Sequence, residues 1–93
     1  QIPEQAAKLI EEKKEKEFQM AYQKGEDLYL IKGYGRQMSG GYSIQVTDLS
    51  ASVNAVFFET KLIGPTEEVQ GGEPSYPYIV VKTEYRDVPV QFR

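Results

Sequence analysis

The sequence predicts a mainly β domain of the α+β class, in which one N-terminal helix precedes about six antiparallel strands. Apolar residues are spaced as in a helix up to Ile10, and from Phe18 onwards they alternate with polar residues. Most later connections are short and favour antiparallel neighbours, because parallel pairs need long crossovers. We expect one domain over residues 1–93, with the strands forming a sandwich or a partial barrel and the helix against one face or end.

Residues 1–16 are predicted to form the helix and residues 17–93 the β domain. Pro3 suits the first helical position, where its missing N–H donor costs nothing. The charged run 11–17 indicates a solvated helix face, because lysines are interleaved there with glutamates. The stripe that would face the sheet is short and consists of Ala6, Leu9 and Ile10.

Runs of alternating or strand-forming residues predict the strands. These runs are residues 18–23, 28–32, 42–49, 53–63, 78–85 and 88–92. In the third run, Tyr42, Ile44 and Val46 share one face. Pro89 cannot donate to a ladder, so we expect the last strand at the edge of a sheet.

Two irregular segments, residues 34–41 and 64–76, are the candidate binding loops. In an antiparallel array successive connections alternate between the two ends, so these segments should emerge at the same end. Together the two segments would form one composite surface, and Glu73 is one of the residues on it. Its predicted partner-binding residues are Tyr34, Arg36, Met38, Ser39, Glu67, Glu68 and Tyr76. Tyrosine suits such a surface because it joins an apolar ring to a polar tip. The isomer of the Tyr76–Pro77 bond is left open.

The residue types argue against catalysis, metal binding and a cofactor. The chain has no cysteine and no histidine, which removes thiol nucleophiles and the commonest general base and transition-metal ligand. No spacing selects a Ser–Lys pair or a pair of catalytic carboxylates, and the acidic loop 67–73 matches no calcium motif. The Gly33–Gly35 segment precedes a strand, whereas a phosphate loop precedes a helix.

The charge and hydropathy of the chain limit its partners. Its net charge of −3 argues against nucleic acid, whose binders usually carry a basic patch. No apolar run approaches the roughly 20 residues that span a membrane. The chain begins at Gln1 rather than at Met, which we interpret as the start of an excised or processed fragment. An upstream signal or lipid anchor is therefore left open.

Several motifs together resemble the C-terminal domain of the PrcB family, over roughly residues 18–92. They are Gly33-Tyr34-Gly35, Ser39-Gly40-Gly41-Tyr42-Ser43-Ile44, Gly64-Pro65 and Tyr76-Pro77-Tyr78-Ile79-Val80-Val81-Lys82. The family is named for a subunit of a bacterial surface protease complex and includes many small lipoproteins. The resemblance implies an extracytoplasmic bacterial domain without catalytic activity, which supports or regulates a protease and takes a protein partner.

Two other functions stay open. The segment Ser39-Gly40-Gly41-Tyr42 is similar to a binding loop of chagasin-type cysteine protease inhibitors, which are β-sandwiches. That resemblance implies a protease inhibitor that uses loops 34–41 and 64–76, although the tryptophan-containing loop of those inhibitors has no counterpart here. The third possibility is a small-ligand or glycan-binding module with a concavity lined by tyrosines. The sequence indicates no particular oligomeric state.

Overall fold

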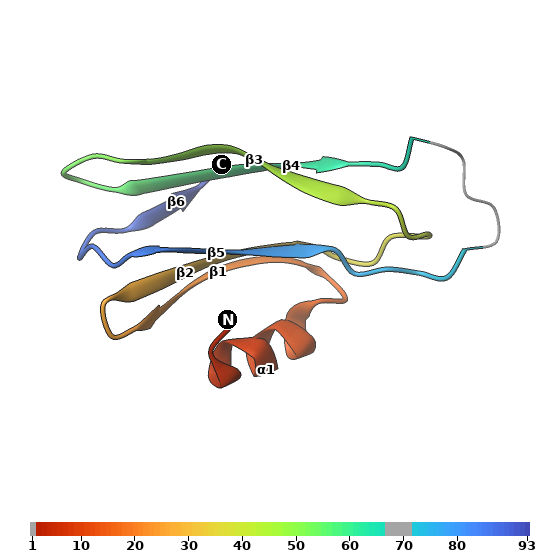
Figure 1. Cartoon of the computed structure of the whole chain (residues 1–93), viewed down its shortest axis with the longest axis horizontal. Helices are drawn as coiled ribbons and strands as arrows, with labels where there is room; N and C mark the ends of the chain where they lie inside the picture. The colour runs from red at the N-terminus through yellow and green to blue at the C-terminus, as the bar shows by residue number, and fades with distance from the viewer. Residues whose placement is uncertain (1, 67–71) are drawn as a thin grey trace.

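The computed structural model describes residues 2–66 and 72–93, which form one short helix and two three-stranded sheets (Figure 1). The elements are α1 (Glu4–Lys13), β1 (Glu17–Lys24), β2 (Asp27–Tyr34), β3 (Ser43–Ala51), β4 (Val56–Ile63), β5 (Tyr78–Glu84) and β6 (Val90–Phe92). One sheet has the strand order β1-β2-β5 and the other β3-β4-β6. The predicted mainly β class is confirmed. The sheets stack as a sandwich and do not close into a barrel.

Helix α1 is shorter than predicted. Pro3 is its N-cap and not its first helical residue, because its ψ of 143° is extended. The carbonyl of Pro3 still accepts the first helical hydrogen bond, from the amide of Ala7 at 3.0 Å. At the other end, the helix stops at Lys13 because the apolar stripe has ended and the following charged residues have nothing to bury. Ala6 and Ile10 from the predicted stripe are buried, as expected.

Strand β2 is the centre of the molecule, because both of its faces are covered. Tyr29 and Ile31 pack with α1, whereas Leu28 and Leu30 on the other face pack with the second sheet. This explains the continuous apolar run in β2, since a strand covered on both faces loses the polar alternation. The layers are therefore α1, then the β1-β2-β5 sheet, then the β3-β4-β6 sheet, as Figure 1 shows.

One strand pair departs from the antiparallel prediction. The pairs β1–β2, β2–β5 and β3–β4 are antiparallel, but β4 and β6 run parallel. The turn after β5 does not make a hairpin. It carries the chain from one sheet to the other, and β6 then lies beside β4, with which it is not consecutive. Strand β6 occupies a sheet edge, as predicted, and Pro89 stands just before it.

The two sheets are joined along one side and open along the other. The β5–β6 turn links them on the joined side, where Tyr85 and Val88 pack on the core between the sheets. Strands β1 and β3 form the two edges on the open side. No residue of β1 or β3 belongs to the described core between the sheets. The predicted row of Ile44 and Val46 therefore remains partly exposed to solvent.

Candidate functional site

The candidate binding surface lies where two connections cross between the sheets. Residues 35–42 lead from β2 to β3, and residues 64–77 lead back from β4 to β5. The described parts of both connections lie at the same end of the sandwich, on the right of Figure 1, so this prediction is confirmed. We call the described part of this region, residues 35–42, 64–66 and 72–77, the crossover end.

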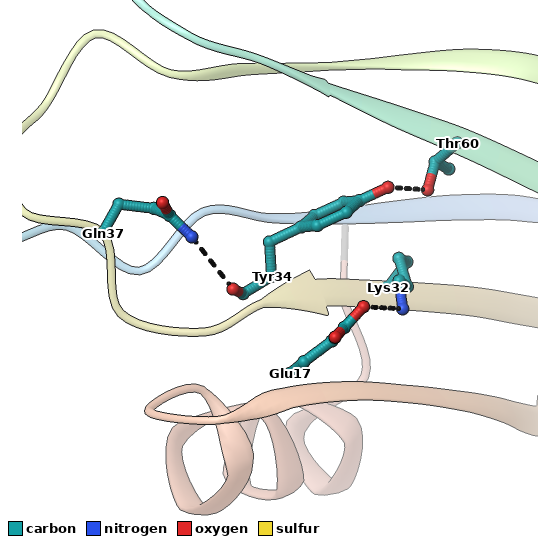
Figure 2. Close-up of polar contacts among 5 residues, drawn as sticks. All are labelled: Glu17, Lys32, Tyr34, Gln37 and Thr60. Atoms are coloured by element: carbon teal, nitrogen blue, oxygen red, sulfur yellow. Dashed lines mark hydrogen bonds and ion pairs between the residues drawn. The ribbon is translucent and has the colours of Figure 1, made fainter.

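A short two-residue bridge holds the two connections together. The amide of Gln37 donates to the carbonyl of Ser75 at 2.8 Å, and the amide of Ser75 donates to the carbonyl of Gln37 at 3.0 Å. The Ser75 hydroxyl also donates to the Ser39 carbonyl at 2.6 Å. The side-chain amide of Gln37 donates to the Tyr34 carbonyl at 3.0 Å, as Figure 2 shows. Sequence reasoning does not predict this bridge, because it is made mainly by backbone atoms.

Two glycines let the connections pass close to their neighbours. Gly35 has φ +74°, and a Cβ there would lie 3.0 Å from the backbone nitrogen of Glu17. Gly41 has φ +85°, and a Cβ there would lie 3.0 Å from the side chain of Pro65 in the other connection. Both positions therefore require glycine on two grounds, the positive φ and the lack of space. These close approaches hold the two ends of the first connection against Glu17 and Pro65.

Tyr34 points between the sheets and not toward solvent. Its hydroxyl shares a hydrogen bond with the hydroxyl of Thr60 on β4 in the other sheet (Figure 2). The ammonium nitrogen of Lys32 lies 5.2 Å from the centre of the Tyr34 ring and 2.9 Å from a carboxylate oxygen of Glu17. Tyr34 thus ties the two sheets together just below the crossover end.

Tyr76 has a similar structural role on the outer side of the first sheet. It is half-buried, and the ammonium nitrogen of Lys14 lies 5.4 Å from the centre of its ring. Lys14 is held by Glu11 at 2.9 Å, and its hydrogen bond to that carboxylate raises the pKa of Lys14 above its ordinary value. The Tyr76–Pro77 peptide bond is trans. Tyr76 therefore links the second connection to the end of α1.

Both connections of the crossover end present accessible side chains, and the large ones of the first are Arg36 and Met38. Arg36 is exposed and Met38 has 75% of its surface exposed. Ser39 is half-buried, and its hydroxyl donates to the carbonyl of Gly40 at 3.2 Å. Glu73 is exposed in the second connection. The predicted residues Glu67 and Glu68 lie outside the described residues.

The chemistry of the described residues suits recognition. An exposed methionine offers an adaptable apolar contact, and an arginine beside it offers a planar hydrogen-bonding group. Within residues 2–66 and 72–93, no three acidic side chains come together as ligands for a metal ion. No helix in that part of the chain is long and apolar enough to cross a membrane.

Comparison with known proteins identifies one family. The model of the PrcB C-terminal family matches residues 28–84. The matched segment runs from β2 to the end of β5 and includes both connections of the crossover end. No curated protein and no solved structure matches the chain.

Proposed function

This chain belongs to the PrcB C-terminal family, and from that premise we propose that it is a non-catalytic protein-interaction domain that supports or regulates a bacterial surface protease complex. The family match covers more than half of the chain and supports an association with such a complex. The absence of cysteine and histidine from the sequence agrees with a supporting rather than a catalytic role.

The proposed setting is extracytoplasmic, at the bacterial cell surface or in a secreted complex. The family membership supports this setting. In this proposal the domain does not insert into the membrane itself, and an upstream lipid anchor is left open. The partner is a protein, and the domain needs no cofactor and binds no nucleic acid.

The proposed partner surface is the crossover end. The single observation that carries it is the bridge between Gln37 and Ser75, which fixes two long connections side by side beneath the exposed Met38. Loops on a rigid base are where binding residues concentrate. In this proposal Arg36, Met38 and Ser39 contact the partner together with Glu67 and Glu68. Tyr34 supports the surface through its hydrogen bond to Thr60, and Tyr76 supports it through the contact of its ring with the Lys14 ammonium group.

A pull-down from envelope extract of the producing bacterium tests this function. The immobilised domain should retain a protein that reacts with an active-site protease probe and is identified by mass spectrometry. The double variant Arg36→Ala, Met38→Ala should retain much less of it. A matched control is Val53→Ala, Arg86→Ala, which removes the same kinds of exposed side chain from the β3–β4 and β5–β6 turns. Both turns lie at the opposite end of the sandwich (Figure 1). The control should retain as much protease as the wild type.

The outcomes separate the parts of the proposal. If the wild type retains no protease-containing complex, the proposed function is wrong. If both double variants retain it equally, the function stands and the crossover end is not the surface. Circular dichroism and thermal unfolding of each variant establish that any loss does not come from unfolding.

A second candidate, a protease inhibitor, is favoured by the position of the two connections. Both lie side by side at one end of a sandwich, as two loops that enter a protease cleft together would need to lie. Titration of papain-like and subtilisin-like enzymes with the domain tests this function. Inhibition that is lost in Arg36→Ala, Met38→Ala would support it. Full protease activity in the presence of micromolar domain would exclude it.

A further inference from the structure

The free edge of β3 is the longest sheet edge in the described structure. It is 9 residues long, and on the side away from β4 it has no partner strand among the described residues. Natural edge strands are usually short or carry lysine or proline, which discourage further pairing. Strand β6 has 3 residues and follows Pro89, β1 ends in Lys24, and β5 contains Lys82. Strand β3 contains neither residue type, and Asp48 is its one charged residue.

An incompletely covered apolar row runs along the same strand. Ile44, Val46 and Leu49 face the same side of the sheet as Leu62, Thr60 and Phe58, their register partners on β4. Val46 is 37% exposed and Leu49 is 41% exposed. An added strand beside β3 would place its own alternate side chains next to this row. Backbone bonds to an edge together with alternate side-chain contacts are how extended peptides are recognised.

The charges around β3 select between possible occupants. The register shifts between Val46 and Asp48, and Asp48 lies opposite Glu59 of β4. The Thr47 hydroxyl donates to Glu59 at 2.9 Å, but in residues 2–66 and 72–93 neither acid forms an ion pair with a lysine or arginine. Acids that lie opposite each other repel, so a cation at this point of the edge would be stabilised. An occupant with a lysine or arginine beside Asp48 satisfies that requirement.

A second copy of β3 does not supply this cation. The strand contains no lysine or arginine, and pairing about a two-fold axis would add a second Asp48 and Glu59 to the same interface. We propose that β3 binds an extended segment of a partner protein as an additional strand, with apolar side chains beside Val46 and Leu49 and a lysine or arginine beside Asp48. This proposal goes beyond the function assigned to the crossover end, because it concerns a different element and a different mode of contact.

Synthetic peptides test the proposal. The first probe has nine residues of alternating valine and threonine with a central lysine, and the second has glutamate in place of that lysine. Both carry blocked termini and a fluorophore, and fluorescence anisotropy reports binding to the whole chain. The lysine probe should bind the wild type more tightly than the glutamate probe. Asp48→Asn should weaken the lysine probe about threefold to fivefold, and Asp48→Lys should reverse the preference.

Two further variants locate the contact. Val46→Lys places a charge in the exposed apolar row and should weaken both probes by about tenfold or more, because inward-pointing charges block edge pairing. Glu26→Lys is a matched control in the exposed β1–β2 turn and should leave both affinities unchanged. Amide shifts in the NMR spectrum should change mainly over residues 43–51 when the lysine probe is added. Arg36→Ala, Met38→Ala should bind the probe normally, so this test is separate from that of the crossover end.

Several results would overturn the proposal. They are equal affinity of the wild type for the two probes, unchanged binding to Val46→Lys, no binding at millimolar probe, or shifts confined to other strands. Sedimentation that shows a dimer of the free chain, abolished by Val46→Lys, would assign the edge to a second copy instead. If Asp48→Lys fails to fold, Asp48→Asn decides the charge preference, because its side chain keeps the same shape.

Discussion

Gln37 and Ser75 exchange both of their backbone hydrogen bonds, at 2.8 and 3.0 Å, although they belong to different connections between the sheets. This reciprocal pair is an isolated antiparallel bridge outside the named strands. It makes the geometry of the first connection depend on the second. The exposed Arg36 and Met38 lie on either side of Gln37 in the chain, so the bridge also fixes where these two side chains emerge.

The side chain of Ser75 should stabilise this arrangement measurably. Ser75→Ala removes the bond to the Ser39 carbonyl and should lower the free energy of unfolding by about 1 kcal/mol. Ser50→Ala is the control, because the Ser50 hydroxyl makes only an exposed bond to Asp48 at 3.3 Å. The control should change stability by less than about 0.5 kcal/mol. Urea unfolding measures both, and equal effects would show that the Ser75 bond does not stabilise the crossover end.

The hydrogen bond between Tyr34 and Thr60 should couple the two sheets. Tyr34→Phe and Thr60→Val each remove one partner and should each cost about 1 kcal/mol, because a half-buried hydroxyl loses its bond. The double variant should cost less than the sum of the two, since the second substitution removes a group that is already unpaired. A double-mutant cycle by urea unfolding measures this coupling. Strict additivity would mean that the two hydroxyls act independently.

The position of Tyr34 also shows where sequence reasoning was insufficient. The predicted strand stopped at Lys32 because Gly33 resembles a turn residue, which left Tyr34 in a surface loop. In the structure β2 continues to Tyr34, in phase with Leu28 and Leu30, so its ring points between the sheets. Gly33 is needed inside the strand because the Phe18 ring lies over it. Only the packing of the Phe18 ring on Gly33 distinguishes this glycine, which lies inside a strand, from a glycine in a turn.

The predictable parts of the fold were those with a local signal. The change of period at Phe18, the alternation in β1 and the strand-forming run of β5 predict the helix and these strands, and Pro89 predicts an edge. The parallel pairing of β4 and β6 had no local signal, because it depends on which sheet the chain enters after Arg86. The meeting of the two connections followed from topology, but Gln37 and Ser75 were missed because their bridge uses backbone atoms. The partner contacts of Arg36 and Met38 stay a prediction.

Gly33 should tolerate no side chain in this packing. A Cβ there would overlap the Phe18 ring, so Gly33→Ala should displace the ring and cost about 1–3 kcal/mol. Gly40→Ala is the control, because a Cβ at Gly40 would have no neighbour within 4 Å. Thermal and urea unfolding compare the two. Adding Phe18→Leu to Gly33→Ala should recover part of the loss, and a neutral Gly33→Ala would contradict this view of the strand.

Tyr85 should make stability depend on pH in the alkaline range. Burial raises the pKa of Tyr85, and the carboxylate of Asp87, which accepts a bond from its hydroxyl at 3.3 Å, raises it further. The folded chain therefore holds this proton at a pH where the unfolded chain, with a tyrosine pKa of about 10, has lost it. The stability that this difference contributes is complete below about pH 10 and is lost as the pH rises through the folded-state value. Lys14, whose pKa is also raised, acts in the same direction.

Tyr85→Phe isolates this effect. Urea unfolding between about pH 9 and about pH 11 should show a smaller loss of stability in Tyr85→Phe than in the wild type, because phenylalanine has no proton to release. Asp87→Asn should fall between the two, since it keeps the burial of Tyr85 but removes the neighbouring negative charge. A pH dependence in Tyr85→Phe as steep as that of the wild type would mean that Tyr85 ionises equally easily in the folded and the unfolded chain.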